Sequence, residues 1–106
     1  MWIIVQNIMT STKKVYDLLN KIPRGRVTTY GEIARKLETK GFRAIGQIVG
    51  KNPDAPRTPC HRVVKADGDI SGYAHGVDKK IALLRGEGIE VQNKKIVDFA
   101  KKFYKF

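Results

Sequence analysis

Three segments in the first half of the chain carry apolar residues at the three- and four-residue spacing of one helical face. The first segment follows Thr10-Ser11-Thr12, whose hydroxyls can cap a helix, and ends at Pro23. The second has capping-box spacing between Thr29 and Glu32 and stops near Gly41, where the third begins. The expected buried faces are, in order, Val15, Leu18, Leu19 and Ile22, then Ile33, Ala34 and Leu37, then Ala44, Ile45, Ile48 and Val49. The second and third helices, joined by a tight turn, resemble a helix-turn-helix.

Proline and glycine punctuate the second half of the chain. Residues 52–59 include three prolines and are predicted to form a stiff loop that leads to Cys60. A strand over residues 61–65, a turn at Asp67-Gly68 and a return over residues 70–73 would form a small hairpin, or wing. Two more helices are expected, one ending near residues 86–88 and a basic one at the C-terminus, with apolar positions at Val77, Ile81 and Leu84, and at Ile96, Ala100 and Phe103.

The chain has 106 residues and 42% hydrophobic content, enough for one compact core but not for two. We therefore expect residues 1–106 to form a single domain that is mainly α with a small β-hairpin, in a winged helix-turn-helix-like arrangement. Trp2-Ile3-Ile4-Val5 is far shorter than a signal-peptide core or a membrane span, and no other apolar run approaches that length. The sequence thus indicates an intracellular, cytoplasmic protein without membrane association.

Charge points to a polyanionic partner. Twenty-one Lys and Arg against ten Asp and Glu give a formal net charge of +11, which attracts nucleic acid through a long-range field and counterion release. A protein that binds membrane surfaces, or one from an organism whose proteins are generally basic, would show the same excess of positive charge. Charge therefore favours a nucleic-acid partner only slightly.

Cys60 is the only cysteine, so the fold has no internal disulfide, no cysteine-rich zinc cluster is possible, and a reducing compartment is indicated. A lone cysteine is usually a small buried hydrophobe. Here His61 and Arg62 follow it directly, and such neighbours favour the reactive thiolate form. Adjacent strand residues point to opposite faces, so a contact between Cys60 and His61 would need a turn or, as we expect, a bridging water.

The motif Pro59-Cys60-His61-Arg62-Val63 resembles the active domain of the O6-alkylguanine-DNA alkyltransferase family. Gly72-Tyr73 and residues 83–88 (Leu-Leu-Arg-Gly-Glu-Gly) follow it in matching order and spacing, and the resemblance runs from about residue 12 to 88. It implies DNA repair by irreversible, single-turnover transfer of the alkyl group of O6-alkylguanine, chiefly O6-methylguanine, to Cys60. No cofactor and no metal are implied. The implied partner is double-stranded DNA, bound through its minor groove by a monomer.

The resemblance also implies roles for individual residues. Cys60 is the nucleophile, His61 the base acting through water, and Glu87 the carboxylate that orients His61. Tyr30 is the candidate proton donor to the departing guanine, and Asn52 would hold the cysteine loop, although a turn residue before Pro53 is a nearly equal interpretation. The expected substrate and DNA contacts are Tyr30, Arg43, Arg62, Val63, Tyr73 and Ala74, with backbone groups near Val63 and Tyr73 touching the extruded base.

Arg43 opens the third helix, where the family places an arginine that enters the base stack as the damaged base swings out. An isolated arginine on a basic protein is more often a solvated charge. On the same helix, Gly46 and Gly50 are small enough for another backbone to approach closely.

Two departures from the family pattern limit what the resemblance implies. Ala74-His75 stands after the tyrosine where many relatives have small residues, so no side-chain hydroxyl can contact the guanine oxygen at Ala74. His75 is either a surface histidine, which we favour, or a wall of the base pocket. Only about a dozen residues precede the first helix, so the additional N-terminal domain of longer relatives is expected to be lacking.

Three other readings compete with alkyl transfer. An alkyltransferase-like protein binds the lesion without accepting the group, but such proteins carry another residue at the cysteine position. A helix-turn-helix regulator with an incidental or redox-sensing thiol leaves the ordered set of Cys60, His61, Tyr73 and Glu87 unexplained. A cysteine hydrolase fits the nucleophile but not the charge or the paired helices.

Overall fold

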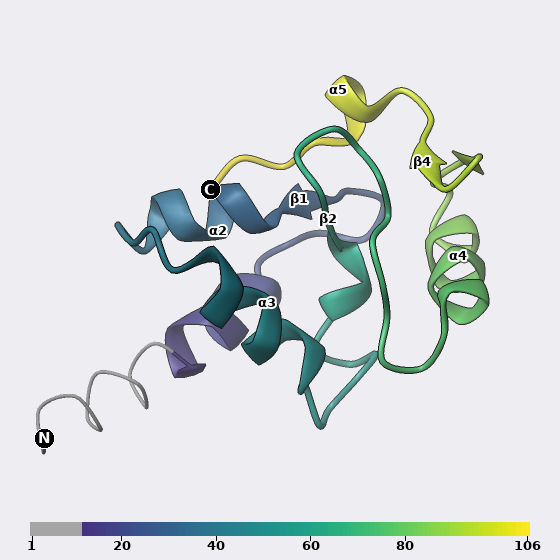
Figure 1. The fold of residues 1–106 in the computed structure, drawn as a ribbon. Coiled ribbons are helices and arrows are strands. Elements are labelled where there is room, and N and C mark those ends of the chain that lie inside the picture. Colours follow the sequence, from purple (N-terminus) through teal and green to yellow (C-terminus); the bar gives the residue numbers. More distant parts are fainter. Residues whose placement is uncertain (1–11) are drawn as a thin grey trace, which may run out of the picture.

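The computed structural model describes residues 12–106, so the predicted cap at Thr10 and Ser11 lies outside the described residues. Residues 12–19 are helical, and this helix ends before the predicted stop at Pro23. The elements that follow are β1 (Thr28–Thr29), α2 (Tyr30–Lys36), α3 (Phe42–Gly50), a 3-10 turn (Cys60–Arg62), β2 (Val63–Val64), α4 (Val77–Gly86), β3 (Val91–Gln92), β4 (Lys95–Ile96) and α5 (Phe99–Lys102). Figure 1 shows the N-terminal helices on one side of the molecule and α4 with the β3–β4 hairpin on the other.

Helices α2 and α3 pack against each other and form the predicted helix-turn-helix. Thr29 caps α2 as its spacing to Glu32 predicts, because its hydroxyl accepts a hydrogen bond from the Glu32 backbone NH at 3.0 Å. The reciprocal half of the capping box is absent, since the Glu32 carboxylate instead binds Arg35 and the backbone NH of Phe106. On α3, Ile45 and Val49 are buried as predicted, whereas Ala44 is exposed.

The two strands next to the cysteine motif hold the two halves of the molecule together. β1 and β2 pair in parallel, with Thr28 opposite Val63 and Thr29 opposite Val64. Successive strand residues point to opposite faces. Accordingly, Val63 belongs to a core cluster with the first helices, and Val64 belongs to a second cluster with α4 and the β3–β4 hairpin.

The predicted turn at Asp67-Gly68 is present, since the Gly68 NH donates to the Lys65 carbonyl at 2.9 Å, but the predicted hairpin over residues 61–73 is wrong in position. Residues 60–62 form a 3-10 turn, and residues 63–64 pair with a strand some 35 residues upstream, so residues 70–73 have no strand partner there. The true hairpin is β3–β4, whose turn residues Asn93 and Lys94 have φ angles of 52° and 61°, as a tight two-residue hairpin turn requires.

The predicted terminal helix is also shorter than expected, because Ile96 lies in β4 and α5 has only four residues. The remaining tail runs alongside β1, with the Tyr104 NH donating to the Val27 carbonyl at 2.7 Å. The fold class, mainly helical with a small hairpin in a winged helix-like arrangement, is confirmed. No helix among residues 12–106 is long and apolar enough to cross a membrane.

Candidate active site

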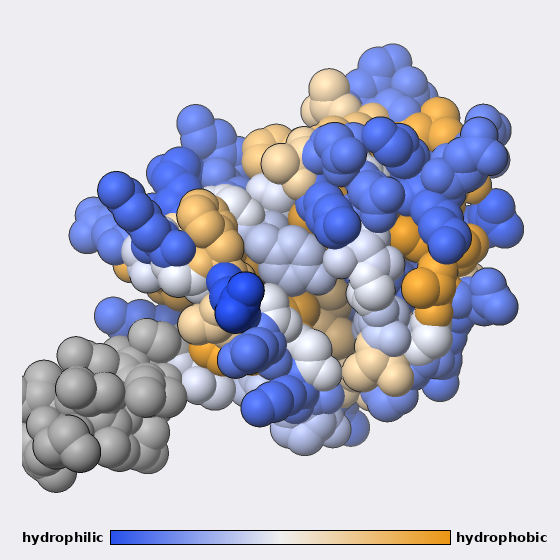
Figure 2. Space-filling model, viewed as in Figure 1, coloured by the Kyte–Doolittle hydropathy of each residue, from blue (hydrophilic) through white to orange (hydrophobic). Residues whose placement is uncertain are grey.

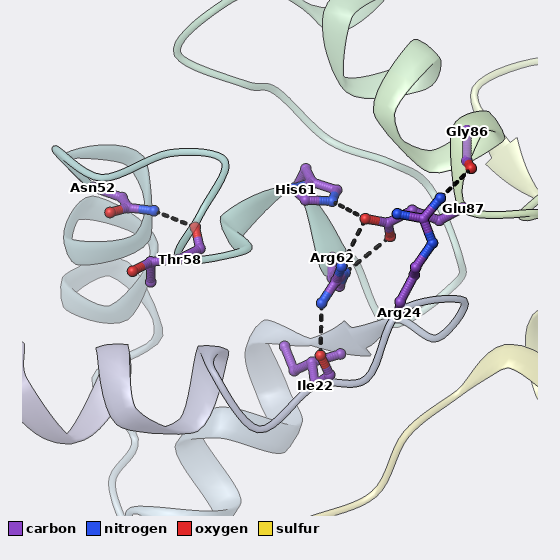
Figure 3. A network of polar contacts seen from close by, with 8 residues as sticks. All are labelled: Ile22, Arg24, Asn52, Thr58, His61, Arg62, Gly86 and Glu87. Carbon is purple, nitrogen blue, oxygen red and sulfur yellow. Dashed lines mark hydrogen bonds and ion pairs between the residues drawn. The ribbon is translucent and has the colours of Figure 1, made fainter.

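Cys60 begins the 3-10 turn and is 6% exposed. The loop before it is held by one carbonyl, since the Thr58 oxygen accepts from the Cys60 NH at 2.8 Å and from the Asn52 side-chain amide at 2.6 Å (Figure 3). The Asn52 side-chain oxygen also accepts from the Asp54 NH at 3.0 Å. Asn52 is buried, so these bonds are shielded from water. The contact expected of Asn52 with the cysteine loop is therefore present.

The cysteine lines a pocket with an empty volume of about 320 Å³. Its walls come from α2, α3 and the two loops on either side of β2, and are formed by Tyr30, Val49, Gly50, Asn52, Ala55, Gly72, Tyr73, Ala74 and His75. Cys60 is the only nucleophilic thiol of the chain, and it faces this enclosure.

Two tyrosines flank the cysteine from separate elements. Tyr30 is the first residue of α2, and the parallel pairing of β1 with β2 brings it to the cysteine motif. Burial raises the pKa of Tyr30, and this outweighs the lowering by a hydrogen bond with Ser71; negative charge on Cys60 also raises the pKa. Burial, followed by the charge of Cys60, raises the pKa of Tyr73 to about 12. The Tyr73 hydroxyl is buried and has no hydrogen-bond partner within residues 12–106. Both phenols therefore keep their protons at neutral pH.

His61 lies behind the cysteine and is 1% exposed. Its Nε2 pairs with Glu87 Oε2 at 2.9 Å (Figure 3). The other ring nitrogen, Nδ1, is buried and has no hydrogen-bond partner in the described part of the chain. Because Glu87 holds the proton on Nε2, Nδ1 is the nitrogen that can accept a proton.

Arg62 shares the same carboxylate. Its guanidinium donates to both oxygens of Glu87, at 2.9 and 2.7 Å, and to the Ile22 carbonyl at 2.8 Å. Burial raises the pKa of Glu87, but the hydrogen bonds from Arg62 and His61 outweigh it, so the pKa lies below the ordinary 4.5. Next to Glu87 in the chain, the Gly86 carbonyl accepts a hydrogen bond from Arg24 at 2.8 Å (Figure 3).

The pKa of His61 is lowered from 6.5, chiefly because burial disfavours the charged imidazole. Glu87 acts in the opposite direction, while the nearby charges of Arg62 and Lys80 favour the neutral ring. Since Arg62 already neutralises Glu87, the carboxylate does not hold a second proton on His61. The result is a neutral, oriented imidazole at pH 7, which is the state a general base needs.

A wide groove of about 1430 Å³ continues from the pocket along α3. It shares Tyr30, Gly50, Gly72, Tyr73 and Ala74 with the pocket and is completed by Phe42, Arg43, Gly46, Lys65 and Ser71. On the face shown in Figure 2, hydrophilic side chains surround a hollowed centre of less polar residues between α3 and the loop that leads to α4. Arg43 is exposed in this groove.

Six of the predicted site residues line the pocket or the groove, namely Tyr30, Arg43, Asn52, Cys60, Tyr73 and Ala74. The other four, His61, Arg62, Val63 and Glu87, line neither. Arg62 was expected to contact DNA, and its guanidinium binds Glu87 and the Ile22 carbonyl, so the DNA contact of this residue stays a prediction. Val63 is fully buried in β2, and its carbonyl accepts from Lys80 at 2.9 Å. His75 is exposed, as the favoured surface interpretation expects, and it also lines the pocket, packing edge-on against Tyr73 with ring centroids 5.4 Å apart.

Lys80 is a buried residue that the sequence reading missed. Its ammonium donates to the carbonyls of Val63, Ile70 and Gly72, which ties β2 to the loop that forms one pocket wall. Burial lowers the pKa of Lys80 to about 8. A signal was present, because Lys80 lies three residues after Val77 and four before Leu84, on the apolar stripe of α4. No group of three or more potential metal ligands occurs among residues 12–106.

Comparisons with known proteins agree with this geometry. The family model for the DNA-binding domain of 6-O-methylguanine DNA methyltransferase matches residues 10–89. A methylated-DNA–protein-cysteine methyltransferase of Candida glabrata is 49% identical over 83 residues, which are 77% of this chain and 40% of that protein. A bifunctional methyltransferase/endonuclease of Picrophilus torridus is 45% identical over 83 residues, which are 77% of this chain and 28% of that protein. The chain thus spans less than half the length of these two curated relatives.

Two solved structures extend the comparison. The OGT of Mycobacterium tuberculosis, in complex with DNA, superposes with a TM-score of 0.69 at 42% identity, over 72% of this chain and 48% of that one. S. pombe Atl1, in complex with damaged DNA containing O6-carboxymethylguanine, superposes with a TM-score of 0.77 at 30% identity, over 92% of this chain and 96% of that one. The match of the family model over most of the chain, together with these relatives, shows that the chain belongs to the family of the 6-O-methylguanine DNA methyltransferase DNA-binding domain.

Proposed function

We propose that this protein repairs DNA by moving the alkyl group of O6-alkylguanine, chiefly O6-methylguanine, onto the sulfur of Cys60. The observation that carries the proposal is a single thiol that lines a pocket, backed by a neutral histidine that a buried carboxylate orients. The names of the curated relatives support the same reaction.

The proposed reaction is a displacement at the alkyl carbon. His61 takes the thiol proton at Nδ1 through a water molecule, and the Cys60 thiolate then attacks the alkyl carbon. The new S–C bond forms as the C–O6 bond breaks, and the electron pair stays with guanine. Tyr30, which stays protonated at neutral pH, neutralises the departing base by donating a hydrogen bond or its proton. The products are a thioether on the protein and unmodified guanine.

The transfer should be stoichiometric. A thioether is a poor leaving group, and no second cysteine exists to release it. We propose that the protein acts as a monomer on duplex DNA, with α3 in the minor groove and the damaged base rotated out of the helix into the pocket. A free thiol used as a reagent suits the reducing cell interior.

Intact-mass measurement after incubation with an oligonucleotide duplex containing O6-methylguanine tests the proposal. One added methyl group per molecule, located on the peptide that contains Cys60, is expected. Repeated turnover by substoichiometric protein, or an unmodified protein that nevertheless binds the duplex tightly, would contradict it.

The second of these outcomes would support a different function, lesion binding without transfer. The near-complete overlap with S. pombe Atl1 favours this alternative, because that structure contains damaged DNA and matches 96% of its own chain. Cys60 and the oriented His61 argue for transfer, since lesion binding alone needs neither a thiol nor a base.

A further inference from the structure

Phe42 is the one large hydrophobic side chain that is exposed among residues 12–106, with 54% of its surface accessible. A single exposed apolar residue is common on protein surfaces and needs no explanation by itself. Phe42 differs because it stands at the start of α3 and lines the groove that leads to the Cys60 pocket.

Apart from Phe42, the residues on this face of α3 are glycines, which have no side chain. Phe42, Gly46 and Gly50 are spaced four residues apart, so they form one stripe along the helix, and all three line the groove. A Cβ atom added at Gly46 or Gly50 would meet nothing within 4 Å. A partner can therefore approach the helix closely between Phe42 at one end and the pocket mouth at Gly50 at the other.

The occupant that fits this groove is duplex DNA. Arg43 stands beside Phe42 and Lys65 lies in the groove wall, so positive charge is available for phosphates. Minor-groove proteins commonly insert apolar side chains such as Phe between base steps, which unstacks the step and bends the duplex.

We propose that Phe42 is an apolar wedge that packs against the base step beside the extruded nucleotide, an inference that rests on the proposed function. Consecutive helical residues point about 100° apart, so Phe42 and Arg43 cannot fill the same gap in the stack. Arg43 takes the place of the extruded base, and Phe42 holds the neighbouring step open. The two residues together would keep the damaged base in the pocket.

The test measures equilibrium extrusion without transfer, in a Cys60→Ser background. Duplexes with and without O6-methylguanine carry 2-aminopurine beside the lesion position, because the fluorescence of this base rises when it unstacks. Phe42→Ala is expected to weaken binding to the lesion duplex about tenfold, the size of one lost aromatic stacking contact, and to reduce the fluorescence rise. Phe42→Leu should recover most of both signals, since it keeps an apolar wedge. Gln92→Ala is the control, because Gln92 is exposed in the β3–β4 hairpin and lines neither the pocket nor the groove.

The outcomes separate the wedge from the proposed function. Equal binding and fluorescence in Phe42→Ala and its parent would overturn the wedge while lesion recognition stands. A parent protein that binds both duplexes equally would overturn lesion recognition, and the wedge with it. Recovery by Phe42→Ser as well as by Phe42→Leu would also overturn the wedge, because a polar side chain cannot supply apolar contact.

Discussion

The pocket and the groove share a wall yet differ in how their side chains are held. Behind the pocket, His61 and Arg62 both bind the Glu87 carboxylate, and the three side chains are largely shielded from water. In the groove, the side chains of Phe42 and Arg43 are exposed. Within the described residues, neither side chain has a hydrogen bond or ion pair that would hold it in place. Chemistry needs groups fixed to within fractions of an ångström, whereas capture of DNA needs surface and charge that are free until it arrives. Substitutions in the two regions should therefore fail in different assays.

The largest expected effect is loss of transfer in Cys60→Ser. A hydroxyl is a far weaker nucleophile than a thiolate, and no other cysteine can replace it. Binding to a lesion duplex should remain nearly unchanged, because the groove is intact. Intact mass and fluorescence anisotropy measure the two properties. A methyl adduct on Cys60→Ser would show that another residue is the acceptor.

Replacing the base should slow transfer without stopping it. His61→Ala is expected to lower the transfer rate about 100-fold, the usual contribution of one general base, with DNA binding largely retained. The pH dependence is diagnostic. Because burial lowers the pKa of His61 below 6.5, the wild-type rate should hold at pH 7 and fall only at more acidic pH, as the folded-state pKa is crossed. Single-turnover rates against pH should lack this acidic decline in His61→Ala.

The same titration bears on stability. The folded protein binds a proton at His61 less readily than the unfolded chain does. The contribution of His61 to the free energy of unfolding is therefore fully present above pH 6.5 and is lost as the pH falls through the folded-state pKa. If the acidic decline in rate persists in His61→Ala, another group controls the reaction.

A groove substitution should show the opposite pattern. Arg43→Ala is expected to slow repair of a duplex lesion about tenfold, because extrusion costs a few kcal/mol that the filling side chain offsets. The reaction with free O6-benzylguanine should hardly change, since a free base needs no extrusion. Arg43→Lys should restore the charge but only part of the rate, because an ammonium cannot stack as a guanidinium does. Equal slowing of both substrates by Arg43→Ala would place Arg43 in the support of the pocket.

Lys80 joins the two regions, and its removal should have the smallest effect. Lys80→Met leaves three carbonyls without a donor but relieves the burial of a charge, so the free energy of unfolding at pH 7 should fall by only about 1 kcal/mol. Burial lowers the pKa of Lys80 to about 8, below its ordinary 10.5. The unfolded chain then binds more protons between these values, so Lys80 should make the wild type gain stability as pH rises from 8 to 10.5.

Denaturant unfolding at several pH values compares the two proteins. Lys80→Met should lack the part of this gain that comes from Lys80, so its deficit should widen with pH. A deficit that stays constant from pH 7 to 10.5 would show that Lys80 does not titrate in this range.

The elements that sequence predicted well have local causes. The cap of α2 depends on Thr29 and the residue three positions later, and the buried stripe of α4 on residues three and four apart. The cysteine, its histidine and the downstream glutamate were found because their order and spacing resemble a known motif. The hairpin was misplaced because Val63-Val64 looks like a local strand, and its partner β1 lies far upstream.

The amino-acid sequence alone determined that the chain is a basic, mainly helical protein with a single cysteine in a recognisable motif, because these properties follow from composition and short-range spacing. Only the tertiary structure decided that Arg62 turns inward to Glu87, that Lys80 binds the pocket wall from behind, and that Phe42 stands exposed in the groove. The placement of each of these side chains depends on which segments, distant in the sequence, the fold brings within its reach. Burial then decides whether the side chain contacts a protein partner or water. No local pattern encodes that distance.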